Sequence, residues 1–139
     1  MSGDTDSVTA EREQVLHQHL EAERSGDPEK ILATFSHPRY ELVGSGRVYD
    51  GSDEVRAYLV ERSHAFPDLA TEVISFWHSP SVVSAELWLS GVYRGPDPDL
   101  GAAGRRFRVR TACFFLFGDG GLVGVRAYFD SGALARQLA

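Results

Sequence analysis

The chain has 139 residues, which is enough for one domain with its own hydrophobic core. Hydrophobic residues make up 42% and charged residues 24%, the balance of a globular rather than a disordered protein. The formal net charge of −6 argues against a general nucleic-acid-binding protein, which needs a basic surface to contact phosphates.

A single cysteine, Cys113, excludes an internal disulfide and a zinc site built from several cysteines. The five histidines show no spacing typical of a metal site, so we expect no metal. Residues 1–10 lack the pattern of a signal peptide, and no apolar stretch of about 18 residues is present. These features predict a cytoplasmic protein without a membrane segment.

Helical patterns occupy the first half of the chain. We expect a loose tail over residues 1–7, followed by a helix that starts near Thr9 and carries apolar residues at helical spacing. The sequence Gly-Asp-Pro at 26–28 is typical of a helix end followed by the cap and first residue of another helix. This second helix is predicted over residues 28–35, and a third over residues 53–65.

From residue 70 on, the apolar pattern changes to a period of two, which is typical of strands. In the predicted strand at 105–117, the odd positions from 107 onward are apolar except for Thr111, and arginines occupy the even positions 106, 108 and 110. This alternation predicts an antiparallel sheet with one covered face. Because the helices precede the long strands, the architecture is expected to be α+β, with helices on one face of the sheet. The predicted strands are a hairpin at 40–43 and 47–49, then 70–78, 81–93, 105–117 and 121–129, with a helical turn at 131–138.

The outer face of the predicted sheet carries a tryptophan among charged residues. Trp88 has the same strand parity as Glu86, and Arg108 and Arg110 lie on the outer face of the next strand. We interpret the arginines as a solvated face that pairs with acids such as Glu86. A tryptophan in these surroundings indicates a subunit contact, so we predict a homodimer through this face, formed by Trp88, Arg108 and Arg110.

An ordered set of motifs covers nearly the whole chain. Phe-Pro-Asp-Leu at 66–69 follows the third helix, Ser-Gly-Val-Tyr-Arg-Gly spans 90–95, and Tyr-Phe-Asp at 128–130 precedes the last helical turn. This succession, from about residue 8 to residue 138, resembles the SnoaL-like polyketide cyclase family of the nuclear transport factor 2-like superfamily, which also contains ketosteroid isomerase. The resemblance implies one domain over residues 8–139. Its fold would be a cone-shaped roll with a curved, antiparallel or mixed sheet and three helices packed on the concave face.

The resemblance also implies a function. The cyclases bind a polyketide ester in a deep apolar cavity and close a ring by aldol condensation without a cofactor. Their acid/base is an aspartate at the end of the last long strand, which Asp130 matches. In the isomerase, a tyrosine on the first helix donates a hydrogen bond to the substrate oxyanion, and His19 falls at that place. The isomerase carboxylates fall near Leu42 and at Cys113, so its standard arrangement is absent.

Each candidate also has a structural interpretation. Asp130 precedes a helical turn and is well placed to cap it. As a catalyst it would instead transfer a proton to or from a carbon next to a carbonyl. That role requires the strand to turn or bulge, so that the carboxylate points into the cavity. His19 is either a titrating cavity group or a hydrogen-bonded side chain at the helix edge. Cys113 is interpreted as a small buried hydrophobe. The residues predicted to contact a hydrophobic ligand are Phe35, Tyr40, Tyr58, Phe66, Trp77, Tyr93, Cys113, Phe115 and Phe129.

Three functional hypotheses remain open. The first is a cofactor-free cyclase, isomerase or lyase that acts on a hydrophobic oxygenated molecule, with Asp130 as acid/base and His19 as a candidate hydrogen-bond partner. The second is a binding module of the same fold that performs no chemistry. The third is a dimeric interaction domain, which would have a filled interior in place of a cavity.

Overall fold

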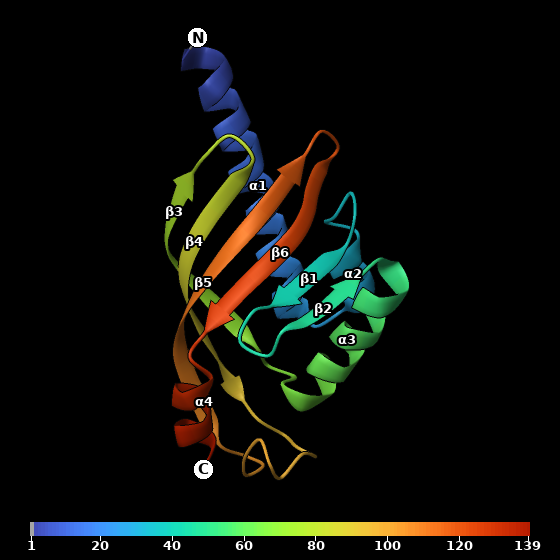
Figure 1. Ribbon diagram of the computed structural model, residues 1–139, viewed down its shortest axis with the longest axis vertical. Coiled ribbons are helices and arrows are strands. Elements are labelled where there is room, and N and C mark those ends of the chain that lie inside the picture. Colours follow the sequence, from blue (N-terminus) through green and yellow to red (C-terminus); the bar gives the residue numbers. More distant parts are fainter. Residues whose placement is uncertain (1) are drawn as a thin grey trace.

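The computed structural model describes residues 2–139, with side chains from Asp6 onward, as an α+β fold with four helices and a six-stranded sheet (Figure 1). None of the helices in this described part is long and apolar enough to cross a membrane. The helices are α1 (Ser2–Ser25), α2 (Pro28–Leu32), α3 (Ser52–Ala65) and α4 (Ser131–Leu138). The strands are β1 (Arg39–Leu42), β2 (Arg47–Asp50), β3 (Ala70–His78), β4 (Val82–Val92), β5 (Arg106–Gly118) and β6 (Gly121–Phe129).

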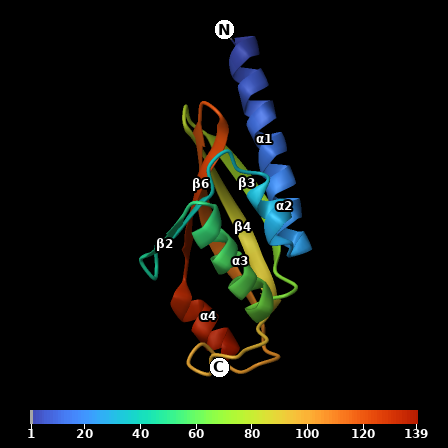
Figure 2. The same cartoon turned by 90° about the vertical axis from the view of Figure 1, so that its right-hand side faces the viewer.

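The sheet is mixed and open, with the strand order β2-β1-β6-β5-β4-β3. Strands β3 to β6 form the antiparallel meander that the sequence predicts, and β1 pairs in parallel with β6. Helix α1 runs along one face of the sheet and contacts β3, while α3 contacts β1 and β2 (Figures 1 and 2). Helix α2 contacts both α1 and α3, and α4 packs on β5. The predicted α+β class with a curved, mixed sheet is confirmed.

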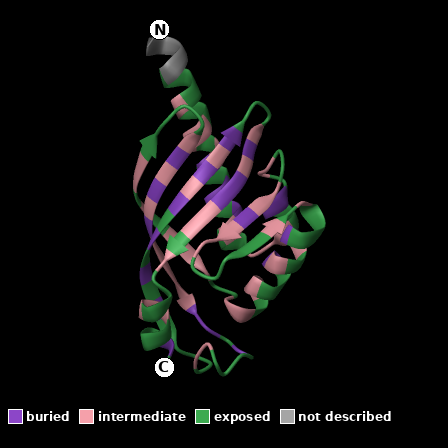
Figure 3. Ribbon diagram, in the orientation of Figure 1, coloured by how far each residue is buried: buried purple, intermediate pink, exposed green. Residues whose placement is uncertain are grey.

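Alternation along the strands separates a buried face from an exposed one (Figure 3). On β5, the odd positions from Phe107 to Phe117 are buried, as predicted. A register shift after Leu116 sets Phe117 opposite Leu122, so that Leu122 also points into the core. The helices complete the main core with a set of fully or nearly buried side chains, namely Leu16, Ile31, Val55 and Leu59.

The outer face of the sheet carries the predicted charge pairs. The Arg110 Nε atom lies 3.2 Å from Glu86 Oε2, and Arg108 Nη2 lies 3.5 Å from Glu72 Oε2. Both guanidinium groups also lie over the ring of Trp88. The distance from the central guanidinium carbon to the ring centroid is 3.8 Å for Arg108 and 5.0 Å for Arg110. The prediction that these arginines form a solvated outer face paired with acids is therefore confirmed.

The junction between α1 and α2 also follows the prediction. Gly26 has a φ of 72°, which favours glycine after a helix, and the Asp27 carboxylate accepts a hydrogen bond from the Glu29 N–H. Two boundaries differ by more than one residue. Helix α1 begins at Ser2 rather than near Thr9, so the tail expected over residues 1–7 is helical from Ser2, and Met1 lies outside the described residues. Helix α2 ends at Leu32 rather than at residue 35, because the next backbone N–H groups form tighter turns.

One end of the sheet is closed by α4 and the loop between β4 and β5. The Tyr93 hydroxyl donates to the Asp97 carbonyl at 2.8 Å, and the Ala102 N–H donates to the Leu138 carbonyl at 2.8 Å. Leu138 is fully buried in a second core cluster with Phe107. This packing leaves space between the inner face of the sheet, α3 and the loop.

Candidate functional site

A cavity of about 660 Å³ occupies this space. Its volume is in the range of small-molecule pockets, and most of its walls are apolar side chains such as Leu87, Val109 and Val125. An open interior does not fit the hypothesis of a filled interaction domain. The predicted ligand-contacting residues that line the cavity are Tyr40, Tyr58, Phe66, Tyr93, Cys113, Phe115 and Phe129.

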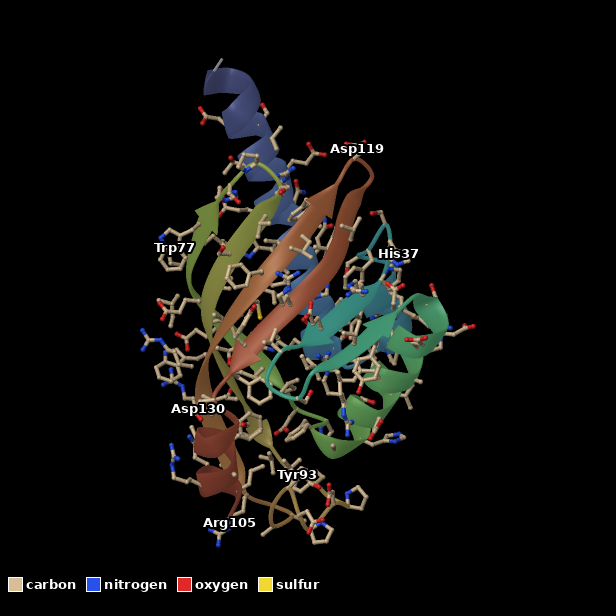
Figure 4. The ribbon with its side chains drawn as sticks, viewed as in Figure 1. His37, Trp77, Tyr93, Arg105, Asp119 and Asp130 are labelled. Atoms are coloured by element: carbon tan, nitrogen blue, oxygen red, sulfur yellow. The ribbon has the colours of Figure 1, made fainter. Side chains whose placement is uncertain are left out.

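Two predicted wall residues lie elsewhere. Trp77 is 55% exposed and points away from the sheet, because a register shift between Val73 and Ser75 moves it to the outer face (Figure 4). Phe35 packs behind the cavity wall, with its ring centroid 5.1 Å from that of His19. The predictions that Trp77 and Phe35 line the cavity are wrong.

Asp130 lies outside the cavity, at the junction of β6 and α4 (Figure 4). It is exposed, and its carboxylate accepts a hydrogen bond from the Ala133 N–H at 3.0 Å, which caps α4. The strand neither turns nor bulges to direct Asp130 inward, so it keeps the outer parity of Tyr128. The geometry matches the capping interpretation and does not fit the predicted acid/base role.

His19 is completely buried and does not line the cavity. Its Nδ1 atom lies 2.7 Å from Thr34 Oγ1, and its Nε2 atom lies 2.9 Å from Glu23 Oε1. The predicted direct contact between His19 and a ligand is therefore not supported by this placement. Of its two interpretations, the hydrogen-bonded one fits, although the side chain lies in the core rather than at a helix edge.

The polar end of the cavity is instead formed by Glu23 of α1 and Arg62 of α3. Arg62 Nη2 donates to Glu23 Oε2 at 2.6 Å, and the two side chains are only 16% and 14% exposed. Burial alone would raise the pKa of Glu23, but the neighbouring Arg62 and His19 lower it from 4.5 to about 2. Glu23 is therefore a carboxylate at neutral pH although it is almost buried.

Three further polar side chains at this end keep their protons. Burial, with a smaller contribution from Glu23, raises the pKa of Tyr40 and that of Tyr58 above their usual value. Burial also raises the pKa of Cys113 to about 12, so its thiol is neutral, as its interpretation as a small hydrophobe requires. The two tyrosine rings flank the Arg62 guanidinium, with centroids 5.8 Å and 5.5 Å from its central carbon. This end can therefore donate hydrogen bonds from a cation and two hydroxyls.

Glu23 and Arg62 were not among the residues predicted from the sequence. A signal for each is present, because Glu23 continues the helical stripe of Leu20 and Arg62 continues that of Leu59. A charged residue within an apolar stripe indicates burial with a partner. The sequence does not show that these two residues are each other's partner.

Comparison with known proteins assigns the family. The family model of SnoaL-like polyketide cyclases matches residues 13–138. The chain belongs to this family. A search of curated proteins finds no match to this SnoaL-like chain.

Solved structures agree with the fold of this SnoaL-like protein. A candidate SnoaL-like polyketide cyclase from Jannaschia sp. CCS1 has a TM-score of 0.78 at 16% identity, over 93% of this chain and 92% of the other. TsrD from Streptomyces laurentii has a TM-score of 0.76 at 28% identity, over 91% and 93%. A Catenulispora acidiphila protein with a ketosteroid isomerase-like fold, in complex with trimethylamine, has a TM-score of 0.75 at 12% identity, over 89% and 91%.

Proposed function

We propose that this SnoaL-like protein binds a hydrophobic, oxygenated small molecule of the polyketide kind and converts it by cofactor-free acid-base catalysis, as a cyclase or isomerase. The observation that carries the proposal is the apolar cavity with one buried polar end. Apolar walls favour a hydrophobic body, whereas the polar end fixes the orientation of an oxygen atom. The charged side chains at this end are only 14% and 16% exposed, and low exposure to water strengthens the electrostatic contacts made there.

The donors at the polar end fit a carbonyl oxygen that becomes negatively charged. Tyr40 and Tyr58 remain protonated because burial raises their pKa values, so each hydroxyl can donate to an enolate oxygen. Arg62 adds a fixed positive charge beside them. Removing one such donor from an enzyme commonly lowers the rate by a factor of about 100 to 1,000.

Glu23 is the carboxylate best placed to accept a proton. The other two carboxylates that line the cavity, Glu61 and Asp97, lie exposed on its rim. In the proposed step, Glu23 takes a proton from a carbon next to the carbonyl. The electron pair of that C–H bond forms a carbon–carbon double bond, and the π electron pair of the carbonyl moves to its oxygen, which gives the enolate. His19 acts as a positioning residue, because its Nε2 atom holds Glu23 Oε1 without reaching the cavity.

Proton exchange in heavy water tests this proposal. We expect the protein to accelerate the incorporation of deuterium next to the carbonyl of an aromatic β-keto ester, followed by proton NMR. Glu23→Gln should lose most of this acceleration, whereas Asp130→Asn should keep it because Asp130 lies outside the cavity. Loss of exchange in Asp130→Asn with retention in Glu23→Gln would overturn the assignment of the base.

A second function, ligand binding without chemistry, is favoured by one observation. Both Glu23 oxygens already contact basic side chains, and the pKa of about 2 makes this carboxylate a weak base. Saturable binding of the β-keto ester with no accelerated exchange in the wild-type protein would support this alternative.

The predicted homodimer stays part of the proposal. Trp88 lies on the outer face of the sheet beneath Arg108 and Arg110, and exposed Ile74 and Tyr128 lie on strands of the same sheet. Apolar side chains of this size on one sheet face support a subunit contact. The predicted cytoplasmic location also stays part of the proposal.

A further inference from the structure

The polar end of the cavity has more hydrogen-bond donors than acceptors. Only Nη2 of Arg62 pairs with Glu23, and no second carboxylate pairs with this guanidinium in the described part of the chain. In that part, no side-chain nitrogen or oxygen is both buried and unpartnered. Arg62 lines the cavity, and its only hydrogen bond among the described residues is the one from Nη2, so its other N–H groups are free to face the cavity.

Glu23 is already shared between two basic side chains. The Thr34 hydroxyl donates to the Ile31 carbonyl at 2.6 Å, so its oxygen accepts a hydrogen bond from His19 Nδ1. The other ring nitrogen, Nε2, lies 2.9 Å from Glu23 Oε1 and 3.4 Å from the Tyr40 hydroxyl. Both oxygens of this carboxylate are therefore already engaged, and Glu23 offers no free acceptor to the remaining N–H groups of Arg62.

The carboxylates on the rim of the cavity do not pair with Arg62 either. Glu61 and Asp97 are exposed to water, which screens their effect on the buried end, and Arg24 and Arg47 line the cavity as well. A buried guanidinium with free N–H groups is matched best by an acceptor that is planar and charged.

We propose that the natural ligand carries a carboxylate, which binds the free N–H groups of Arg62 and the hydroxyls of Tyr40 and Tyr58, while its apolar body fills the rest of the cavity. A neutral carbonyl oxygen offers two lone pairs, whereas a carboxylate offers about four and can accept from the guanidinium and the hydroxyls together. This inference rests on one part of the proposed function, namely that the ligand binds in the cavity. It names the chemical class of the molecule bound there.

A matched pair of probes tests the inference. Anthracenecarboxylate and its primary amide, anthracenecarboxamide, have the same apolar body and differ in the charge of the head group. Their affinities are measured by isothermal titration calorimetry for the wild type, Glu23→Gln, the double variant Glu23→Gln with Arg62→Gln, and the outer-face control Arg110→Gln. The double variant avoids leaving either partner charged and buried alone, and circular dichroism checks that each variant is folded.

We expect the wild type and Arg110→Gln to bind the carboxylate about tenfold or more tightly than the amide. Glu23→Gln should widen this preference, because it removes the competing negative charge. The double variant should lose the preference but still bind the amide, since the apolar walls are unchanged. Equal affinity for the two probes in the wild type, or a preference that survives in the double variant, would overturn the carboxylate inference and leave the proton-exchange test untouched. Binding of neither probe, together with absence of exchange, would overturn the proposed function and the inference with it.

Discussion

At the scale of single residues, Glu23 is held ionised in a place where burial opposes its charge. Its pKa falls from 4.5 to about 2 on folding, so it stabilises the fold fully above pH 4.5, and this contribution is lost as the pH falls toward 2. We expect the free energy of unfolding of the wild type to fall over this range by about 3 kcal/mol more than that of Glu23→Gln. Urea unfolding across the acidic range measures both curves. Parallel curves would show that Glu23 is not tightly paired.

The thiol of Cys113 should be inert in the folded protein. Burial raises its pKa to about 12, so the reactive thiolate is scarce at mildly alkaline pH, and the side chain is only 9% exposed. We expect iodoacetamide to modify Cys113 at least about 100 times more slowly in the native protein than in urea, as followed by mass spectrometry. Equal rates in both conditions would contradict the buried, protonated thiol.

At the scale of elements, Asp130 acts on α4 rather than on a ligand. Its carboxylate caps the helix, whose last residues pack against β5 and the loop through Leu138. We expect Asp130→Ala to lower the free energy of unfolding by about 1 kcal/mol, and Asp130→Asn to have little effect because asparagine also caps. Thermal unfolding of the two variants measures this difference. A loss of stability in Asp130→Asn equal to that in Asp130→Ala would show that the charge, not the cap, is what matters.

The sequence predicts the positions of helices and strands better than it predicts which side chains from different elements contact one another. The strand expected at 121–129 matches β6, because its alternation is bounded by a glycine turn and a helix cap. The orientation of Trp77 could not be predicted, since one bulge after Val73 reverses the parity of the rest of β3. The contact between Glu23 and Arg62 joins two helices across 39 positions, and no local pattern encodes how those helices cross.

At the scale of the whole molecule, the two faces of one sheet have different chemistry. The inner face and the helices enclose an apolar cavity with one polar end, where Arg62 pairs with Glu23. The outer face combines ion pairs with exposed aromatic side chains. A ligand site and an assembly surface can therefore be altered separately, which makes each proposal testable without disturbing the other.

The outer face gives the last prediction, which concerns the oligomeric state. If two copies pair through this face, Tyr128, which is 40% exposed in the single chain, becomes buried between them. An aspartate there would place an unpaired charge in the contact, so we expect Tyr128→Asp to be a monomer. Val60→Asp is a matched control, because Val60 is 39% exposed but lies on α3, away from this face. Sedimentation equilibrium should give twice the chain mass for the wild type and Val60→Asp, and the chain mass for Tyr128→Asp. A wild type that stays monomeric at micromolar concentrations, or a Tyr128→Asp variant that stays dimeric, would rule out assembly through the outer face.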